Sequence, residues 1–312
     1  MKTFYNLNLT KHTFKNLNNL NFPKFLINLL LLVLLVAPIS SFSQKYSKGE
    51  DKVPKNKSWC FSINTGVAFA NKYQANFYNG SSGNQNTINY VLGNKYWNQE
   101  IRRLVQDTFN LRELPTNMKY SPAFCVGFGI KKKFNNNFGV FGNFNFSRFK
   151  ALDAFTMTIG NYPVGYSFPN IKTYAIWGKE DRTNIDLGVS MELKLVKQIY
   201  ALVEVGFNIN STRVKENKIA IESATYTLID IYANNPYTPN TNMQEYQIKE
   251  GGLGIGAFVS PGFEFRFNQN VAVQLLGSFY WTRINLMHYD AYKPQYNVML
   301  RFVFSTSADK VI

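Results

Sequence analysis

His288 is the residue in this sequence that is best suited to acid–base chemistry. The 312-residue chain has two histidines, His12 near its start and His288, which Tyr289 and Asp290 follow. An imidazole and a carboxylate can transfer protons together, but only in a mutual geometry that a spacing of two residues does not set. We therefore expect His288 and Asp290 to be ordinary loop residues and expect no catalysis.

The other residues that could bind a metal or phosphate are few. One histidine and two separated cysteines, Cys60 and Cys125, do not give the ligand spacing of a zinc site. The glycine-rich run at 251–256 lacks the Lys-Ser/Thr of a phosphate-binding loop. We expect no metal and no cofactor. Because the two cysteines begin consecutive antiparallel strands, they should lie at opposite ends of these strands, too far apart for a disulfide.

Charged residues occur at alternate positions in several apolar runs. In 183–195, for example, Leu187 and Val189 alternate with Asp186 and Gly188. Successive side chains of a strand point to opposite faces, so each run has one apolar face and one face of small, polar and charged residues. The charged residues on these second faces are Asp186, Glu192, Lys194, Glu204, Glu264, Arg266 and Arg301.

Eight runs with this alternation predict eight strands. Most exceed the usual five or six residues of a soluble sheet, and most reach the roughly 9 to 11 residues that a tilted strand needs to cross a bilayer. Their ranges are 59–69, 123–132, 138–149, 183–195, 199–210, 253–267, 271–282 and 295–304.

The connections between these strands alternate in length. Long ones at 70–120, 150–182 and 211–250 alternate with tight turns, and 285–294 is intermediate. Short turns at one end and long loops at the other are typical of outer-membrane barrels. We predict an all-β fold, an eight-stranded antiparallel up-and-down transmembrane β-barrel. The alternative is a β-sandwich, in which the apolar faces would meet inside.

An eight-stranded barrel has an interior that side chains just fill. The seven charged residues would then face inward and would have to be paired. We predict a lumenal network in which Arg266 and Arg301 face Glu192, Glu204 and Glu264. A structural plug of salt bridges is favoured over a gate or proton path, and such a barrel should conduct little.

The first long connection contains a helical pattern. Trp97, Ile101, Leu104 and Val105 recur at the spacing of one helix face, so a short amphipathic helix is expected in this outer loop. It could serve as a lid or as a docking helix for a partner. We favour a helix that packs its apolar stripe on the barrel rim.

Residues 1–43 have the order of a secretory signal peptide. Lys2, Lys11, Lys15 and Lys24 precede a leucine-rich core, and small residues lie before Gln44. The expected organisation is a signal peptide at 1–43, a lysine-rich tail at 44–57, a barrel at 58–304 and a C-terminal tail at 305–312. Removal of 1–43 takes four of 34 basic residues, which leaves 30 − 19 = +11. An exported basic protein is expected to meet acidic lipid or glycan rather than nucleic acid. The alternative, which we favour, is that its lysines form a solvated rim.

The signal that ends in Phe42-Ser43-Gln44, the Gly/Phe-rich meander and the last strand, Val298 to Phe304, resemble the outer-membrane β-barrel proteins of Bacteroidetes, loosely the PorT-like group. The resemblance covers most of 58–304 and rests on pattern; the added tail 305–312 departs from it. It implies outer-membrane localisation, contact with outer-membrane lipid, and a structural or interaction role through the outer loops. Since that group includes a component associated with type IX secretion, other envelope or secretion-system proteins are the implied partners. The alternative is a hydrolase or acyltransferase at the outer rim that uses His288 with Asp290.

Overall fold

A computed structural model describes residues 59–82, 87–135, 137–160, 169–228, 250–268 and 270–306. All of them belong to one unit of the chain, Lys55–Ile312. The predicted signal peptide, most of the predicted tails and parts of the long connections lie outside these residues. No helix in the described ranges is long and apolar enough to span a membrane.

The described residues form an all-β antiparallel sheet of eleven strands. Eight of the strands are long and correspond to the eight predicted ones, whereas the other three are short and lie in the predicted loops. The long strands are β1 (Trp59–Phe69), β4 (Ala123–Lys133), β5 (Phe138–Ile159), β6 (Ile171–Val196), β7 (Ile199–Ile221), β9 (Gly251–Arg266), β10 (Val271–Thr282) and β11 (Lys293–Thr306). The short strands are β2 (Phe109–Glu113), β3 (Lys119–Tyr120) and β8 (Ala224–Thr227).

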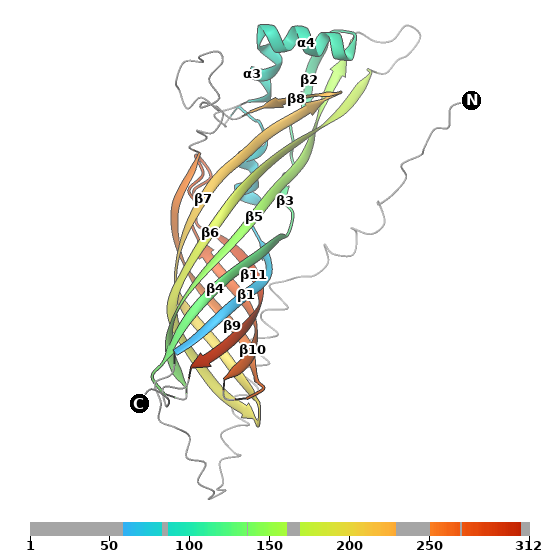
Figure 1. The fold of residues 1–312 in the computed structure, drawn as a ribbon. Helices are drawn as coiled ribbons and strands as arrows, with labels where there is room; N and C mark the ends of the chain where they lie inside the picture. The colour runs from blue at the N-terminus through green and yellow to red at the C-terminus, as the bar shows by residue number, and fades with distance from the viewer. Residues whose placement is uncertain are drawn as a thin grey trace, which may run out of the picture. The chain divides into compact units, whose positions relative to one another are not determined.

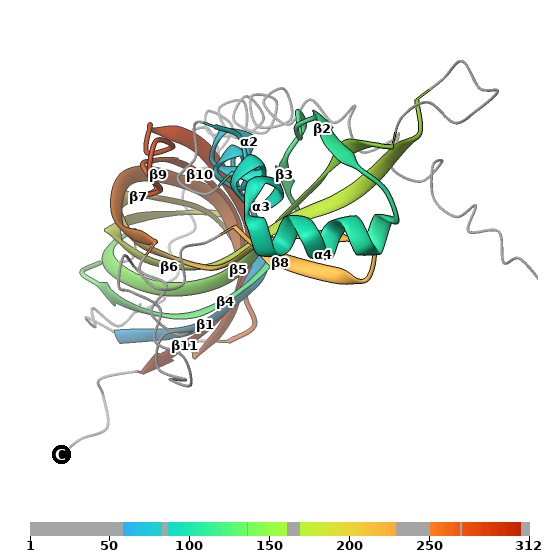
Figure 2. The same cartoon turned by 90° about the horizontal axis from the view of Figure 1, so that it is seen from above.

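Each long strand is hydrogen-bonded to a long strand on both sides. Strands that follow one another along the chain pair in order from β1 to β11. The first strand also pairs with the last, with Val67 opposite Val298 and Phe61 opposite Phe304. The eight strands, seen from the side in Figure 1, therefore form a closed circuit of pairings, which appears as a ring from above in Figure 2. The tight turns lie at one end of this ring, together with the first residue of β1 and the last residue of β11.

Close strand packing explains one pair of glycines. Gly188 of β6 is directly opposite Gly206 of β7. A Cβ on Gly188 would lie 2.2 Å from the carbonyl oxygen of Val205, and a Cβ on Gly206 would lie 2.1 Å from that of Leu187. Both positions are inward-facing, so a side chain at either one would push these two strands apart.

Strands β5, β6 and β7 are much longer than the sequence pattern predicted. The predictions that 150–182 and 211–250 are loops are wrong for 150–159, 171–182 and 211–221, which continue the three strands beyond the ring. The alternation does persist in these segments, with Phe155, Met157 and Ile176 buried on one face. It was missed because the opposite face changes from apolar to charged residues, such as Lys150, Lys179 and Arg213.

The predicted 70–120 insertion folds over this extension. It contains α2 (Lys72–Ala75), η1 (Asn76–Tyr78), α3 (Ile88–Gly93) and α4 (Lys95–Val105), together with β2 and β3. The helices lie over one face of the extended strands (Figure 2). Their apolar residues join those of β5, β6 and β7 in a single core, which also includes Tyr226 of β8.

The amphipathic helix is α4. The side chain of Asn94 caps it by accepting hydrogen bonds from the backbone N–H groups of Tyr96 and Trp97. Its predicted stripe faces the core: Ile101 and Val105 are buried, and Trp97 packs against the same cluster. The described part of the insertion thus holds three α-helices rather than the single one that was expected.

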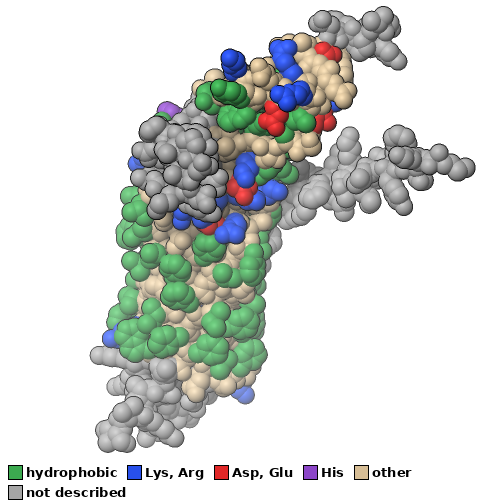
Figure 3. All heavy atoms as spheres, turned by 45° about the horizontal axis from the view of Figure 1, so that its top comes forward, with side chains coloured by type: hydrophobic (Ala, Val, Ile, Leu, Met, Phe, Trp, Pro, Cys, Tyr) green, Lys and Arg blue, Asp and Glu red, His purple; other side chains and the backbone are tan. Residues whose placement is uncertain are grey.

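The ring is apolar outside and polar inside. Leu187 and Val205 are 49% and 48% exposed on its outer surface, whereas Glu204 is 1% exposed within it. A β-sandwich would show the opposite arrangement. Hydrophobic side chains are spread over the barrel wall in Figure 3, below the region where charged side chains gather.

Candidate functional site: the charge network inside the ring

Three carboxylates meet four cations near the tight-turn end of the ring. Each of these residues occupies an inward-facing position of its strand, and the residues come from strands that are not all neighbours in sequence. The carboxylates are Glu192 of β6, Glu204 of β7 and Glu264 of β9; the cations are Lys131 and Lys133 of β4, Arg266 of β9 and Arg301 of β11.

Arg301 and Glu204 form the central pair of this network. The Nη1 atom of Arg301 lies 2.7 Å from Oε1 of Glu204, and Nη2 lies 3.2 Å from Oε2. This two-pronged geometry is the strong form of a guanidinium–carboxylate contact. Nη1 also donates to Gln274 at 3.1 Å, and Nε donates to Asn64 at 3.1 Å. The guanidinium of Arg301 is thereby held across the interior, from β11 toward β7.

Glu192 and Glu264 share the remaining cations. The Lys133 ammonium lies 2.6 Å from Glu192, and Arg266 pairs with both Glu192 and Glu264. Arg266 also stacks on the ring of Tyr200, with its guanidinium carbon 3.5 Å from the ring centroid. Lys131 bridges the two halves of the network, at 3.4 Å from Glu192 and 3.2 Å from Glu204.

Asp186 forms no direct ion pair with a described residue, and hydrogen bonds through Asn145 and Asn64 connect it to Arg301. It accepts hydrogen bonds from Asn208 at 2.7 Å, from Tyr280 at 3.0 Å and from Asn145 at 3.2 Å. Its burial is therefore compensated by neutral donors.

The structure places six of the seven predicted charged residues inside the ring and the seventh at its tight-turn end, next to the β6–β7 turn. Lys194 is exposed, and no ion pair reaches it in the described part of the chain. Its place in the alternation of β6 is that of the inward-facing residues, but the β6–β7 pairing shifts between Lys194 and Val196. At the last turn of the hairpin, strand parity no longer distinguishes inside from outside.

Sequence reasoning missed Lys131 and Lys133. Both have the same parity as Cys125, Gly127 and Gly129, the inward face of β4, so the alternation itself would have identified them. They were overlooked because a lysine pair at a strand end resembles a solvated turn.

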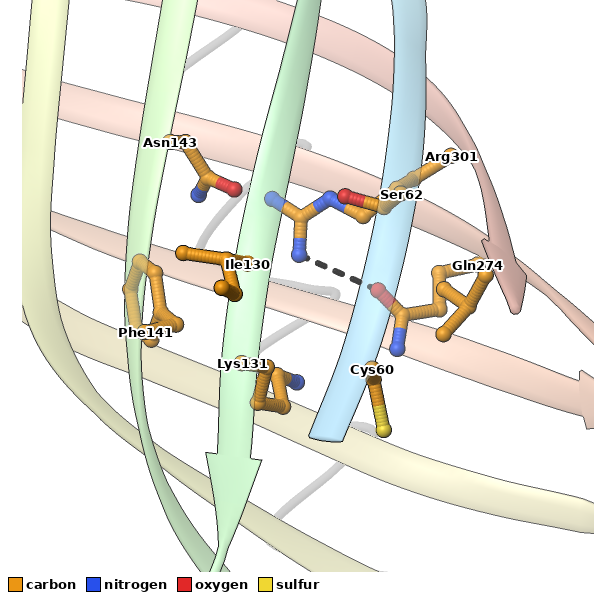
Figure 4. Close-up of a pocket in the computed structure, with 9 residues that line it drawn as sticks. Cys60, Ser62, Ile130, Lys131, Phe141, Asn143, Gln274 and Arg301 are labelled. Atoms are coloured by element: carbon orange, nitrogen blue, oxygen red, sulfur yellow. Dashed lines mark hydrogen bonds between the residues drawn. The ribbon is translucent and has the colours of Figure 1, made fainter. Parts of the chain in front are cut away.

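The described side chains leave little free space around the network. A cavity of about 10 Å³ remains beside it, close to the smallest volume that holds one water molecule. Gln274 and Arg301 lie on one side of this cavity, and Lys131 and Cys60 lie near its lower end (Figure 4).

A second buried ion pair lies at the other end of the ring. Arg182 and Glu180, both of β6, pair while they are almost fully buried. The hydroxyl groups of Tyr78 and Tyr120 donate to Glu180 at 2.5 and 3.0 Å. The guanidinium carbon of Arg182 lies over the Tyr120 ring, 5.1 Å from its centroid, and Nη1 donates to Gln295 at 2.9 Å. The cluster ties the inserted segment, through Tyr78, to the inner wall of the ring.

Burial changes the acidity of these two tyrosines. It is the largest cause that raises the pKa of both Tyr78 and Tyr120 well above the ordinary value of 10.0, and the negative charge of Glu180 adds to it. Both phenols therefore remain neutral donors to Glu180 at physiological pH. Sequence reasoning had placed Glu180 and Arg182 in a loop and missed this cluster.

His288 and Asp290 are not brought together as a catalytic pair in the described part of the chain. The side chain of His288 is exposed, and its backbone carbonyl accepts a hydrogen bond from Tyr73 at 3.3 Å. Asp290 pairs instead with Arg283. Cys60 and Cys125 are both free and buried, and they lie at opposite ends of the β1–β4 pair. Among the described residues, no group of His, Cys, Asp and Glu could hold a metal ion.

Comparison with protein-family models gives no match, and comparison with curated proteins gives none either. Solved structures with similar folds include neisserial surface protein A, at 7% identity and a TM-score of 0.37, covering 79% of this chain and 96% of that one. The outer membrane protein OprG of Pseudomonas aeruginosa is 10% identical, with a TM-score of 0.38 and coverage of 81% and 98%. Ail, the attachment invasion locus protein of Yersinia pestis, is 9% identical, with a TM-score of 0.33 and coverage of 80% and 99%. These identities and scores are too low to assign a function.

Proposed function

We propose that this protein is an outer-membrane β-barrel protein with a plugged, salt-bridged lumen. Its role is structural or interactive, and the outer segments provide its contacts with other envelope proteins. The observation that carries the proposal is the inverted surface of the ring: exposed apolar side chains outside and paired charges within. Water would penalise this arrangement, whereas a bilayer requires it.

The dimensions of the apolar surface support a bilayer. Strand β1 has 11 residues. At a tilt of roughly 40°, a strand of this length rises about 25 Å along the barrel axis, which is the height of the apolar band of an outer-membrane barrel. The closed circuit of pairings also leaves no unpaired strand edge for lipid to meet.

Aromatic residues lie at both ends of this band. Trp59 and Phe304 are exposed near the tight turns, and Trp281 is exposed near the long connections. Aromatic side chains favour the interface between lipid and water. Tight turns on the periplasmic side then place the helices and the β5–β7 extension outside the cell.

The network inside the ring supports a plug rather than a channel. The paired charges and hydrogen bonds fill the interior where an open pore would hold water. A role in secretion rests on the resemblance to the PorT-like group alone. A catalytic role for His288 has no such support, because Asp290 is engaged by Arg283.

Membrane fractionation and heat-modifiable gel migration of the full chain test this proposal. We expect the protein in the outer-membrane fraction and different migration before and after boiling, because a closed barrel resists unfolding by detergent at room temperature. Recovery of the protein as a detergent-free soluble species, with unchanged migration, would contradict the proposal.

A further inference from the structure

The outer surface of β5, β6 and β7 changes abruptly from apolar to basic. Phe144, Ile185 and Ile209 lie side by side in register as the last fully apolar row. One step further out, Phe146 pairs with Thr183, which pairs with Ser211. Beyond this row every outward position on the three strands is charged for two successive rows.

These two rows contain five cations and two carboxylates. Arg148, Asp181 and Arg213 are opposite one another in the first row, and Lys150, Lys179 and Glu216 are opposite one another in the second. Lys215 lies at the register shift of β7 and reaches Asp181 at 3.6 Å. We call Arg148, Lys150, Lys179, Arg213 and Lys215 the basic patch. Figure 3 shows charged side chains gathered above the hydrophobic side chains of the barrel wall.

The carboxylates do not neutralise the basic patch. Asp181 is engaged by Arg148 at 2.7 Å, and Glu216 is engaged by Lys179 at 3.1 Å. Neither Lys150 nor Arg213 has an ion-pair partner in the described ranges. Lys150 and Lys179 are moreover directly opposite across the β5–β6 pair, where like charges destabilise a sheet. An external anion would remove this repulsion.

The position of the patch limits what that anion can be. It continues the same outward face that meets lipid below, one row above the end of the apolar band. The layer at this height, on the side of the long connections, is the headgroup layer of the outer leaflet. Lysine side chains can lie along the apolar surface with their ammonium groups in that layer, and arginine can bind a phosphate with two parallel hydrogen bonds.

We infer that the basic patch binds the phosphates of a phosphorylated glycolipid headgroup in the outer leaflet. This inference rests on the proposed membrane orientation and adds a specific lipid partner on one side of the barrel. The phosphates neutralise Lys150 and Arg213 and relieve the repulsion between Lys150 and Lys179. They also anchor the extension of β5–β7 at a fixed height above the bilayer.

The test compares variants of the full-length protein in phosphatidylcholine vesicles that contain one added lipid. The added lipids are bisphosphorylated lipid A, the same lipid without its phosphates, and phosphatidylglycerol. The test variant is Lys150→Gln/Lys179→Gln. The matched control is Lys194→Gln/Lys197→Gln, which removes two exposed lysines at the β6–β7 turn, at the opposite end of the ring. Lipid binding is measured by titration with a fluorescent form of each lipid.

We expect the unaltered protein to bind bisphosphorylated lipid A in preference to the other two lipids. The Lys150→Gln/Lys179→Gln variant should bind it on the order of tenfold more weakly, given the contribution of each basic residue at an anionic membrane surface. The control variant should bind as the unaltered protein does. Equal binding to lipid A with and without phosphates, equal binding to phosphatidylglycerol, or an equal loss in the control would overturn the inference.

Heat-modifiable migration of the same samples separates two failures. If the protein inserts and shows heat-modifiable migration but has no preference for lipid A, only the lipid inference is wrong. If it does not insert, the membrane proposal is wrong and the lipid inference with it.

Discussion

Arg301 and Glu204 show how a single buried charge depends on its partner. Arg301 reaches Glu204, Gln274 and Asn64 from β11. Two charges withdrawn from water are tolerated only when their mutual attraction and hydrogen bonds offset the desolvation. Loss of one partner leaves the other buried and only partly compensated.

The substitution Arg301→Met should therefore be costly. It leaves Glu204 with Lys131 as its remaining cation, at 3.2 Å. We expect the free energy of unfolding in detergent or lipid, measured by urea titration, to fall by about 3 kcal/mol. The matched control is Arg283→Met, which breaks the half-exposed pair with Asp290 and should cost at most about 1 kcal/mol. Equal decreases in the free energy of unfolding for the two substitutions would show that the interior ion pair contributes no more to stability than the half-exposed one.

Tyr78 and Tyr120 should make stability sensitive to alkaline pH. Their pKa values in the folded protein are raised well above 10.0, whereas in the unfolded chain they remain near 10. The folded state thus holds these protons more tightly, so their contribution to stability is fully present below about pH 10 and is lost as the pH rises further. Urea unfolding between pH 8 and 11 should show this loss.

The variant Tyr78→Phe identifies the source of the alkaline effect. It lacks the titrating hydroxyl and should show a smaller decrease in stability above about pH 10, although it is less stable at neutral pH because Glu180 loses a donor. An unchanged decrease would assign the effect to other groups, such as the surface lysines.

At the scale of elements, the extension of β5–β7 and the inserted helices support each other. The three strands expose an apolar inner face beyond the ring, and α3 and α4 cover it. Isolated helices of this length are marginal in water, so α4 depends on its contact with the strands. The ring has its own closed set of hydrogen bonds and should not depend on the helices.

The substitution Ile101→Ala tests this division. Ile101 is fully buried in the shared core, and its truncation should cost about 2 to 5 kcal/mol of local stability. We expect faster hydrogen exchange in 88–105 while heat-modifiable migration of the barrel is retained. The exposed Arg103→Ala on the same helix should change exchange little. Loss of heat-modifiable migration with Ile101→Ala would show that the ring and the helices fold as one unit.

At the scale of the whole molecule, the filled interior predicts low conductance. The network of Glu192, Glu204, Glu264 and their cations crosses the ring where a pore would have to pass. Reconstitution of the full chain in planar bilayers should give no large, steady single-channel currents. Porin-sized currents would show that the network opens and that the lumen is not plugged.

Much of the architecture could be predicted from the sequence because strand parity is a local property. The alternation of Leu187 and Val189 with Asp186 and Gly188 marks the two faces of β6 whatever its neighbours are. The same rule located Glu204, Glu264 and Arg301 on inward faces. It failed for Lys194, where the register of the hairpin shifts. It would also have placed Lys131 and Lys133 on the inward face, but it was not applied to them.

The extension of β5–β7 could not be predicted in the same way. Beyond the buried Glu180–Arg182 pair its inner face is apolar, because it packs against helices, and its outer face begins with two charged rows instead of the apolar rows that meet lipid on the ring. When the apolar face of a strand changes from outward to inward along its length, the sequence pattern resembles a loop. Only the position of the covering helices shows that the strand continues.

The sequence alone determined the two faces of each strand and the antiparallel order of the strands. It also identified the charged residues that need an ion-pair partner when they are buried. The tertiary structure decided which strands close the ring and therefore which charges meet. Arg301 and Glu204 are 97 positions apart, and their contact depends on the registers of several intervening strand pairs. These registers arise from hydrogen bonding around the whole circuit, which no local stretch of the chain encodes by itself.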